Sequence, residues 1–436
     1  MDPRPIRIYS KEDVPRLRYI AGIILGDILG LSWEVITDKR KLGKFPVVNY
    51  SSENLKDSFK INPDSLLFET GISSREINVS EWKSLPVFFP TSSDSELPFD
   101  IFAASFYLVS RYEEYLEFQA DEFGRFPAAQ SLSVRNGFQC IPIVDLWAKE
   151  LAKAFLRKFS TIAFKHNDYK ALISFDTDQP FAYLGKSLIR SIGGVFHDIT
   201  YNEGHLSDIY KTVAKGEKDP YEVFDYITEN IEKTNTDARF FFAVGDYSQY
   251  DKNPSWKNSG YRKLILELSA KYKTGLHPSF YASENSSMVN AEIVRLKTIM
   301  GKEILSGRFH YIRLFMPQSY RDIYKAGIIE DYSMGYPDEP GFRAGIARPF
   351  YFYDVLEDKE TNLKIFPFQI IDTTLYRYKK LDPASSKEVI LHLINETRKV
   401  GGLFVSIWHN TSLLNNEEWQ GWREVFEFIL KEQEPV

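Results

Sequence analysis

Strand-length apolar runs alternate with amphipathic segments over the second part of the chain. The apolar runs lie at residues 171–176, 239–244, 274–277, 310–315, 331–334, 366–371 and 402–408. Segments with helical periodicity lie between most of them, at residues 220–232, 261–272, 290–300, 318–326 and 385–400. This alternation is typical of parallel β/α architecture. It predicts an α/β fold, an incomplete (β/α)7 barrel over residues 166–436, with a site at the carboxyl ends of its strands.

Residues 1–165 show a different pattern, in which shorter strand-like pieces accompany three expected helices at residues 17–31, 99–115 and 143–159. In the last of these, Val144, Trp147 and Leu151 fall on one face at helical spacing. A polar stretch without periodicity, residues 160–169, marks the expected boundary. The pattern predicts a smaller accessory domain of the α+β or α/β class, with no set of residues that suggests chemistry.

Composition narrows the classes of protein and partner. A chain of 436 residues with 43% hydrophobic content can bury a large core in two domains. The net charge of −6 is spread over mixed charges, so we expect neither a nucleic-acid nor a membrane surface. Cys140 is the single cysteine, which excludes an internal disulfide. The start of the sequence lacks the features of a secretory signal and no apolar run is long enough to cross a bilayer, so we expect a cytoplasmic protein. The oligomeric state stays open.

Two acidic residues end the first strand of the expected barrel, in the stretch ALISFDTDQ. The apolar run delivers Asp176 and Asp178 to the point where the strand ceases to be buried. Because an unpaired carboxylate is costly to desolvate, the pair should either bind a cation or perform acid–base chemistry in a cleft. The alternative is a strand end that caps a neighbouring helix or turn.

Four further polar residues follow or begin the later strands. They are His277 in TGLHPS, His310 in SGRFHYIRL, Asp372 in FQIIDTT and His409 in LFVSIWHN. Each histidine is a candidate for a site at the barrel mouth or an ordinary core or surface residue. A carboxylate such as Asp372 favours the protonated form of a bonded imidazole, which a general acid needs near neutral pH. Arg343, in PGFRAG, either clamps a catalytic carboxylate or belongs to an exposed loop.

The motifs DTD, GLHPS, GFR, IID and SIWHN occur in this order over about residues 170–436. Together they resemble the five successive motifs of the polysaccharide deacetylase superfamily, metal-dependent carbohydrate esterases with an incomplete (β/α) barrel. The resemblance implies a hydrolase that removes N-acyl groups, above all acetyl, from an amino-sugar glycan. It also implies a divalent metal, for which zinc is expected.

The same resemblance implies a role for each matching residue. Asp176 would be the catalytic base, with Arg343 orienting it. Asp178 and His277 would hold the metal. His409 would be the general acid, tuned by Asp372.

Two departures from the family pattern bear on the site. Members usually carry a second metal-binding histidine four residues after the first, and this chain has Tyr281 there. Neutral tyrosine is a poor ligand compared with imidazole. We expect His310 to supply the missing ligand, with Glu284 as a weaker candidate. Ala344 and Gly345 follow Arg343, where a proline and an aromatic residue are usual.

Two other functions stay open from the sequence. One is a non-catalytic glycan-binding protein on the same barrel, in which the standard metal site has been lost. The other takes Asp176 and Asp178 as a phosphatase nucleophile pair or a nucleotide-sugar metal motif. An insertion at residues 191–219, which contains His197 and His205, either shapes access to the site or is a purely structural excursion.

Overall fold

The computed structural model describes residues 5–159, 162–184, 218–414 and 416–434. Its larger sheet has the strand order β12-β13-β11-β10-β9-β8-β7-β15-β14. All neighbours are parallel except the β12–β13 hairpin. The strands are β7 (Lys170–Thr177), β8 (Ala238–Phe242), β9 (Lys273–Leu276), β10 (Ser306–Gly307), β11 (Glu330–Asp331), β12 (Phe350–Asp354), β13 (Lys359–Ile365), β14 (Ile370–Ile371) and β15 (Leu403–His409).

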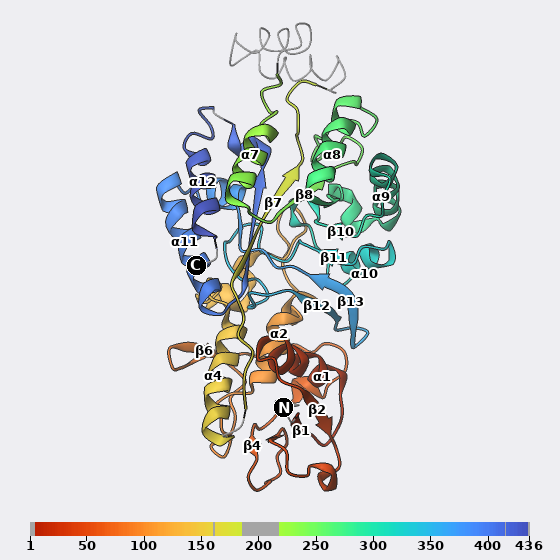
Figure 1. The fold of residues 1–436 in the computed structure, drawn as a ribbon. Helices are drawn as coiled ribbons and strands as arrows, with labels where there is room; N and C mark the ends of the chain where they lie inside the picture. Colours follow the sequence, from red (N-terminus) through yellow and green to blue (C-terminus); the bar gives the residue numbers. More distant parts are fainter. Residues whose placement is uncertain (1–4, 160–161, 185–217, 415, 435–436) are drawn as a thin grey trace.

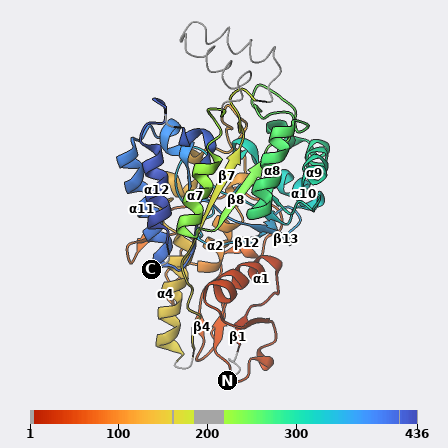
Figure 2. The same cartoon turned by 45° about the horizontal axis from the view of Figure 1, so that its top comes forward.

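Helices flank this sheet on both sides (Figures 1 and 2). They are α7 (Phe224–Thr234), α8 (Ser259–Lys271), α9 (Ser286–Met300), α10 (Gln318–Lys325), α11 (Pro383–Lys399) and α12 (Trp422–Glu432). Local residues set their ends. The Asn258 side chain accepts from the backbone N–H of Tyr261 and so caps α8. Asp382 caps α11, with Pro383 at the first helical position. Gly301 ends α9 in a left-handed conformation, φ 68°.

The parallel β/α class predicted from the sequence is confirmed, but one predicted strand is wrong. Residues 310–315 do not form a strand, because the chain turns at the 3-10 helix His310–Ile312. Tyr311 and Ile312 have φ values of 58° and 55°, which no strand accommodates. The β12–β13 hairpin was not predicted. It contributes the antiparallel edge of the sheet.

The first part of the chain forms a second, smaller parallel sheet with the order β2-β1-β3-β4. Its strands are β1 (Ile6–Tyr9), β2 (Trp33–Ile36), β3 (Val47–Asn49) and β4 (Phe59–Lys60). The accompanying elements are α1 (Pro15–Ala21), which continues as a π-helix over Gly22–Ile28, the hairpin of β5 (Ser80–Trp82) and β6 (Leu85–Val87), α2 (Ile101–Val109), α3 (Leu132–Arg135) and α4 (Ile143–Lys158). The sheet lies below the larger one in Figure 1.

A continuous apolar core links the two parts of the chain. A single cluster of buried side chains includes Ile8 and Phe106 from the first part and Tyr353 and Phe426 from the second. The Tyr19 hydroxyl donates to the Tyr351 carbonyl across the junction, at 2.7 Å. The two sheets are therefore packed against each other through apolar side chains rather than joined only by the chain. None of the described helices combines the length and the apolarity needed to cross a membrane.

Candidate metal and catalytic site

Asp176 and Asp178 lie at the carboxyl end of β7. Side chains two apart along a strand share a face, and Thr177 between them points the other way, donating its hydroxyl to the Phe241 carbonyl at 2.8 Å. Asp176 is only 3% exposed. The strand therefore delivers both carboxylates to one side of the sheet, as the sequence predicted.

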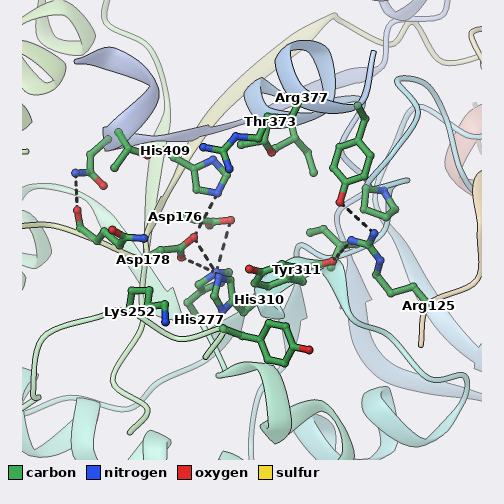
Figure 3. A pocket seen from close by; sticks show the side chains of 18 of the residues that line it. Arg125, Asp176, Asp178, Lys252, His277, His310, Tyr311, Thr373, Arg377 and His409 are labelled. Atoms are coloured by element: carbon green, nitrogen blue, oxygen red, sulfur yellow. Dashed lines mark hydrogen bonds and ion pairs between the residues drawn. The ribbon is translucent and has the colours of Figure 1, made fainter. Parts of the chain in front are cut away.

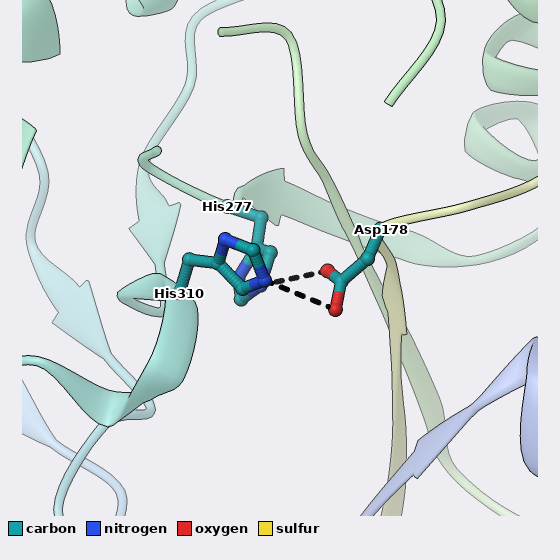
Figure 4. A group of neighbouring side chains, drawn as sticks. All are labelled: Asp178, His277 and His310. Carbon is teal, nitrogen blue, oxygen red and sulfur yellow. Dashed lines mark ion pairs between the residues drawn. The ribbon is translucent and has the colours of Figure 1, made fainter. Parts of the chain in front are cut away.

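Asp178, His277 and His310 converge on one point. Their candidate ligand atoms all lie within 4.8 Å of one another. The Nε2 atom of His277 is 3.0 Å from Asp178 Oδ1, and the Nε2 atom of His310 is 3.2 Å from Asp178 Oδ2. His277 directly follows β9, and His310 begins the turn after β10. Figure 4 shows both imidazoles facing the Asp178 carboxylate.

Each histidine is held by its other ring nitrogen. The Nδ1 of His277 lies 2.6 Å from the Arg308 carbonyl, which can only accept, so Nδ1 donates and Nε2 is the nitrogen that faces Asp178. The Nδ1 of His310 lies 2.9 Å from Asp251 Oδ1. A carbonyl or carboxylate behind the imidazole is the usual arrangement at histidine metal ligands. Asp251 lies in a loop after β8, and its pairing with His310 was not visible in the sequence.

The charges in this cluster depend on one another. Burial opposes ionisation of Asp178, but His310 and His277 outweigh it and hold its pKa well below its usual range. Burial lowers the pKa of His310, whereas Asp178 and Asp251 raise it to about 10 overall. Apart from each other, at 3.0 Å, the buried Asp178 Oδ1 and His277 Nε2 have no hydrogen-bond partner among the described residues. An oxygen and two imidazole nitrogens that converge in this way fit a divalent cation such as zinc.

Arg308 is the arginine that approaches Asp176. Its Nη1 lies 3.3 Å from Asp176 Oδ1, and its guanidinium stands 4.2 Å from the centre of the Phe241 ring. The side chain is fully buried. Sequence reasoning did not assign Arg308 a role, although it lies two residues before His310 in the stretch SGRFHYIRL.

Arg343, which the family pattern implied beside Asp176, lies elsewhere. Its Nε and Nη2 donate to the two carboxylate oxygens of Glu114 at 2.8 and 2.6 Å. Arg111 donates to the same carboxylate at 2.7 Å. Burial would raise the pKa of Glu114, but the two arginines hold it below its ordinary value. The structure thus places Arg343 in a buried ion cluster between the two parts of the chain.

His409 and Asp372 form a pair on the other side of the acids. The Nδ1 of His409 is 2.7 Å from Asp372 Oδ1, and the backbone N–H of His409 donates to Oδ2 at 2.7 Å. The Nε2 lies 3.5 Å from Asp178 Oδ2. Burial lowers the pKa of His409, but Asp372, Asp178 and Asp176 raise it to about 9 overall. Asp372 therefore favours the protonated form of this imidazole.

These groups line a pocket of about 300 Å³ at the carboxyl ends of the strands (Figure 3). Aromatic side chains shape its rim: Tyr250, Tyr311, Tyr378 and Trp419. Tyr250 is stacked on Phe280, with ring centres 3.8 Å apart. The rim therefore offers flat apolar faces above a polar floor.

The first part of the chain also reaches this pocket, through a loop that contains Phe123 and Arg125. Arg125 donates to the Tyr311 carbonyl at 2.8 Å and to the Tyr378 hydroxyl at 3.2 Å, and it is paired with Asp121 at 2.7 Å. The Phe123 ring packs on Tyr311, with centres 5.1 Å apart. The loop is thus joined to the residue that follows His310.

The other candidates from the sequence lie outside the cluster. Tyr281 is 43% exposed and points towards Gln249, with its hydroxyl 3.5 Å from the amide nitrogen. Glu284 is paired with Arg313. His197 and His205, in the expected insertion, lie outside the described residues.

Comparison with known proteins adds the following. Residues 6–160 match a family of unknown function, DUF7033. No curated protein matches the chain. Among solved structures, a Mycobacterium smegmatis protein assigned as a polysaccharide deacetylase is 14% identical, with 62% of this chain and 86% of that chain covered and a TM-score of 0.41.

Two further structures are similar at the same level. A Pseudomonas aeruginosa PAO1 protein, also assigned as a polysaccharide deacetylase, is 10% identical over 60% of this chain and 83% of its own, with a TM-score of 0.39. A CE4 family pseudoenzyme from Bacillus anthracis is 10% identical over 62% of this chain and 63% of its own, with a TM-score of 0.31. At these sequence identities and TM-scores, a function can be argued only from the residues of the site.

Proposed function

We propose that the protein is a metal-dependent hydrolase that removes N-acyl groups, above all acetyl, from an amino-sugar glycan. The observation that carries this proposal is the convergence of Asp178, His277 and His310 beside Asp176, with His409 on the opposite side. An acid, a base and a cation site around one small pocket are what amide hydrolysis requires. In this proposal the larger sheet is an incomplete (β/α)7 barrel whose site lies at the usual end of its strands.

Asp178, His277 and His310 would hold the cation, and zinc suits a set of two imidazoles and one carboxylate. When bound, such an ion polarises a carbonyl and lowers the pKa of a coordinated water molecule. The hydrogen bonds from Nδ1 of both histidines support this role, because they keep each Nε2 directed at Asp178.

The remaining residues would move the protons. Asp176 lies within 3.9 Å of His277 and accepts the proton of the attacking water. The guanidinium of Arg308 faces Asp176 at 3.3 Å and orients the carboxylate that serves as the base. His409, kept protonated by Asp372, donates its proton to the departing amine.

The pocket favours a sugar as the group that carries the amide. Its volume of about 300 Å³ is at the lower end for small-molecule sites and suits one sugar unit with its acyl group. The half-buried Tyr250 and Tyr311 line this pocket, and aromatic faces pack well on the apolar faces of sugar rings.

The experiment compares the zinc-loaded protein with the chelator-treated protein on chitotetraose, with acetate release as the readout. We expect release only from the loaded protein. Asp178→Asn and His310→Ala should lower the rate at least about 100-fold and reduce bound zinc, measured by elemental analysis.

His166→Ala is the matched control, because the His166 side chain is 91% exposed and its ion-pair partner is Asp168, which is not part of the cluster. It should retain both zinc and activity. If wild-type protein binds chitotetraose but neither zinc binding nor acetate release is found, the non-catalytic glycan-binding function takes the place of the hydrolase. If Asp178→Asn releases acetate at the full rate, the proposed site is wrong.

A further inference from the structure

The smaller sheet has the topology of a ligand-binding sheet. Its four strands are all parallel, and β1 lies between β2 and β3. The chain leaves β1 through α1 and joins β2 on one side, whereas it leaves β3 and joins β4 on the other side. The strand order therefore reverses between β1 and β3. In open parallel α/β sheets, ligands bind in the crevice outside the carboxyl ends of the strands at such a point.

A cavity of about 420 Å³ lies at this point. It is lined by the residues that directly follow three of the strands: residues 11–12 after β1, residues 50–52 after β3 and residues 62–63 after β4. Phe68, Ser92 and Asp94 complete the lining. Its volume falls within the range of small-molecule sites. A site of ligand size thus occupies the crevice that the topology creates.

The charges around this cavity are largely balanced within the protein. Asp94 is paired with Lys60 and also accepts from the Asn62 amide at 2.6 Å. Lys11 lies 3.8 Å from Glu53. These groups give the cavity no excess of positive or negative charge, so a strongly charged ligand would gain little binding free energy there.

The remaining lining is suited to a neutral, hydroxyl-rich molecule. Ser52 offers a hydroxyl group that both donates and accepts, and Asn62 and Ser92, whose N–H and O–H groups donate to Asp94 at 2.6 Å each, offer oxygen atoms as acceptors. Phe68 is half-buried and stacked on Tyr50, with ring centres 5.9 Å apart and planes at 19°. A flat aromatic face beside polar groups matches a sugar ring, which has apolar faces and hydroxyl groups at its edge.

The loop after β1 argues against a nucleotide. Sites that bind phosphate at this position use a glycine-rich turn, whose backbone N–H groups approach the anion. Here the loop contains Lys11, Glu12 and Asp13 and no glycine before Pro15. The loop therefore lacks the backbone turn with which such sites hold a phosphate group.

We propose that this cavity binds a neutral saccharide unit, at a site on the smaller sheet that is separate from the pocket beside Asp178. The proposal does not depend on the hydrolase being active. It gives the first part of the chain a ligand of its own, held by residues that follow β1, β3 and β4.

The test measures binding of chitotetraose and cellotetraose to the full chain by calorimetry, with AMP as the nucleotide probe. Ser52→Trp fills the cavity from an exposed position, so the fold is preserved, and Phe68→Ala removes the aromatic face. We expect at least one of the two saccharides to bind the wild-type protein, and each variant to weaken that binding about tenfold or more.

Ser93→Trp is the matched control, because Ser93 is exposed beside Ser92 but does not line the cavity. It should bind as the wild-type protein does. Tyr378→Ala, at an exposed residue of the other pocket, should weaken only the saccharide binding that occurs there, so the binding that remains reports on the cavity of the smaller sheet. The proposal fails if neither saccharide binds, if Ser52→Trp binds them as the wild type does, or if only AMP binds in a manner that Ser52→Trp abolishes. Acetate release from the substrate, measured in parallel, separates this outcome from failure of the hydrolase.

Discussion

Two buried regions of this protein pair an arginine with carboxylates, and they differ in how completely the polar groups are satisfied. At the junction of the two sheets, Arg343 donates from all three nitrogens, two to Glu114 and one to the Gly335 carbonyl. At the mouth of the larger sheet, the three guanidinium nitrogens of Arg308 and the Oδ1 of Asp176 have no hydrogen-bond partner of good geometry among the described residues.

The difference separates a structural ion pair from a reactive one. A buried charge whose donors are all used is stable and inert, since every alternative state loses hydrogen bonds. A buried charge with unused donors costs free energy, and such groups are typical of functional sites. Arg343 and Arg308 are therefore expected to respond to the same substitution in opposite ways.

The largest effect is expected from Arg343→Met. Removal of the guanidinium leaves the carboxylate of Glu114 buried with Arg111 alone, and breaking a buried pair costs about 3–5 kcal/mol. Urea denaturation should show this loss in the free energy of unfolding, with acetate release per folded molecule unchanged. Arg40→Met, at an exposed pair, should change stability by less than about 1 kcal/mol. Unchanged stability with lost activity would place Arg343 in the active site after all.

The same substitution at the other arginine should act on the rate. Arg308→Met removes the guanidinium that faces and orients Asp176 at 3.3 Å, so kcat should fall about 100-fold, with KM and zinc content little changed. Stability should stay level or rise, because the unused donors disappear with the side chain. Steady-state kinetics and urea denaturation on one preparation measure both quantities. A stability loss as large as that of Arg343→Met, with kcat retained, would remove the contrast between the two regions.

A smaller effect is expected at the loop that joins the two regions. Arg125 donates to the carbonyl of Tyr311, next to His310, and Tyr311 holds a left-handed conformation that needs support. Arg125→Met should weaken zinc affinity about tenfold, since residues behind a metal ligand have effects of this size. Competition with a chelator of known affinity measures it. Arg377 lines the same pocket but is paired with Glu418, so Arg377→Met should bind zinc with the affinity of the wild-type protein.

The sequence alone carried much of the architecture. The alternation of apolar runs and amphipathic segments predicted β7, β8, β9 and β15 and the helices between them, because burial on a parallel sheet requires those periods. It also placed Asp176 and Asp178 at the end of β7, since an acidic side chain is costly to bury unless it is paired.

Other features were decided only when distant segments met. The sequence favoured Arg343 beside Asp176, but the choice between two arginines depends on which of them the packed strands bring to that carboxylate. Arg308 follows β10, which lies in the same parallel sheet as β7, and its guanidinium reaches Asp176. Arg343 is instead paired with Glu114 from the first part of the chain. Local patterns carry no information on such pairs, since a side chain's partner is set by tertiary contacts rather than by its neighbours in sequence.

The cavity on the smaller sheet shows the same division. Short apolar runs in residues 1–165 indicated strands, but neither their order nor the reversal between β1 and β3 could be deduced from them. Strand order is fixed by how the sheet and helices pack as a whole. The sequence by itself therefore determined which residues are buried and where polar side chains follow the buried strands. The tertiary structure decided which of those polar groups face one another, because Coulomb interactions and hydrogen bonds act only between side chains that packing brings within a few ångströms.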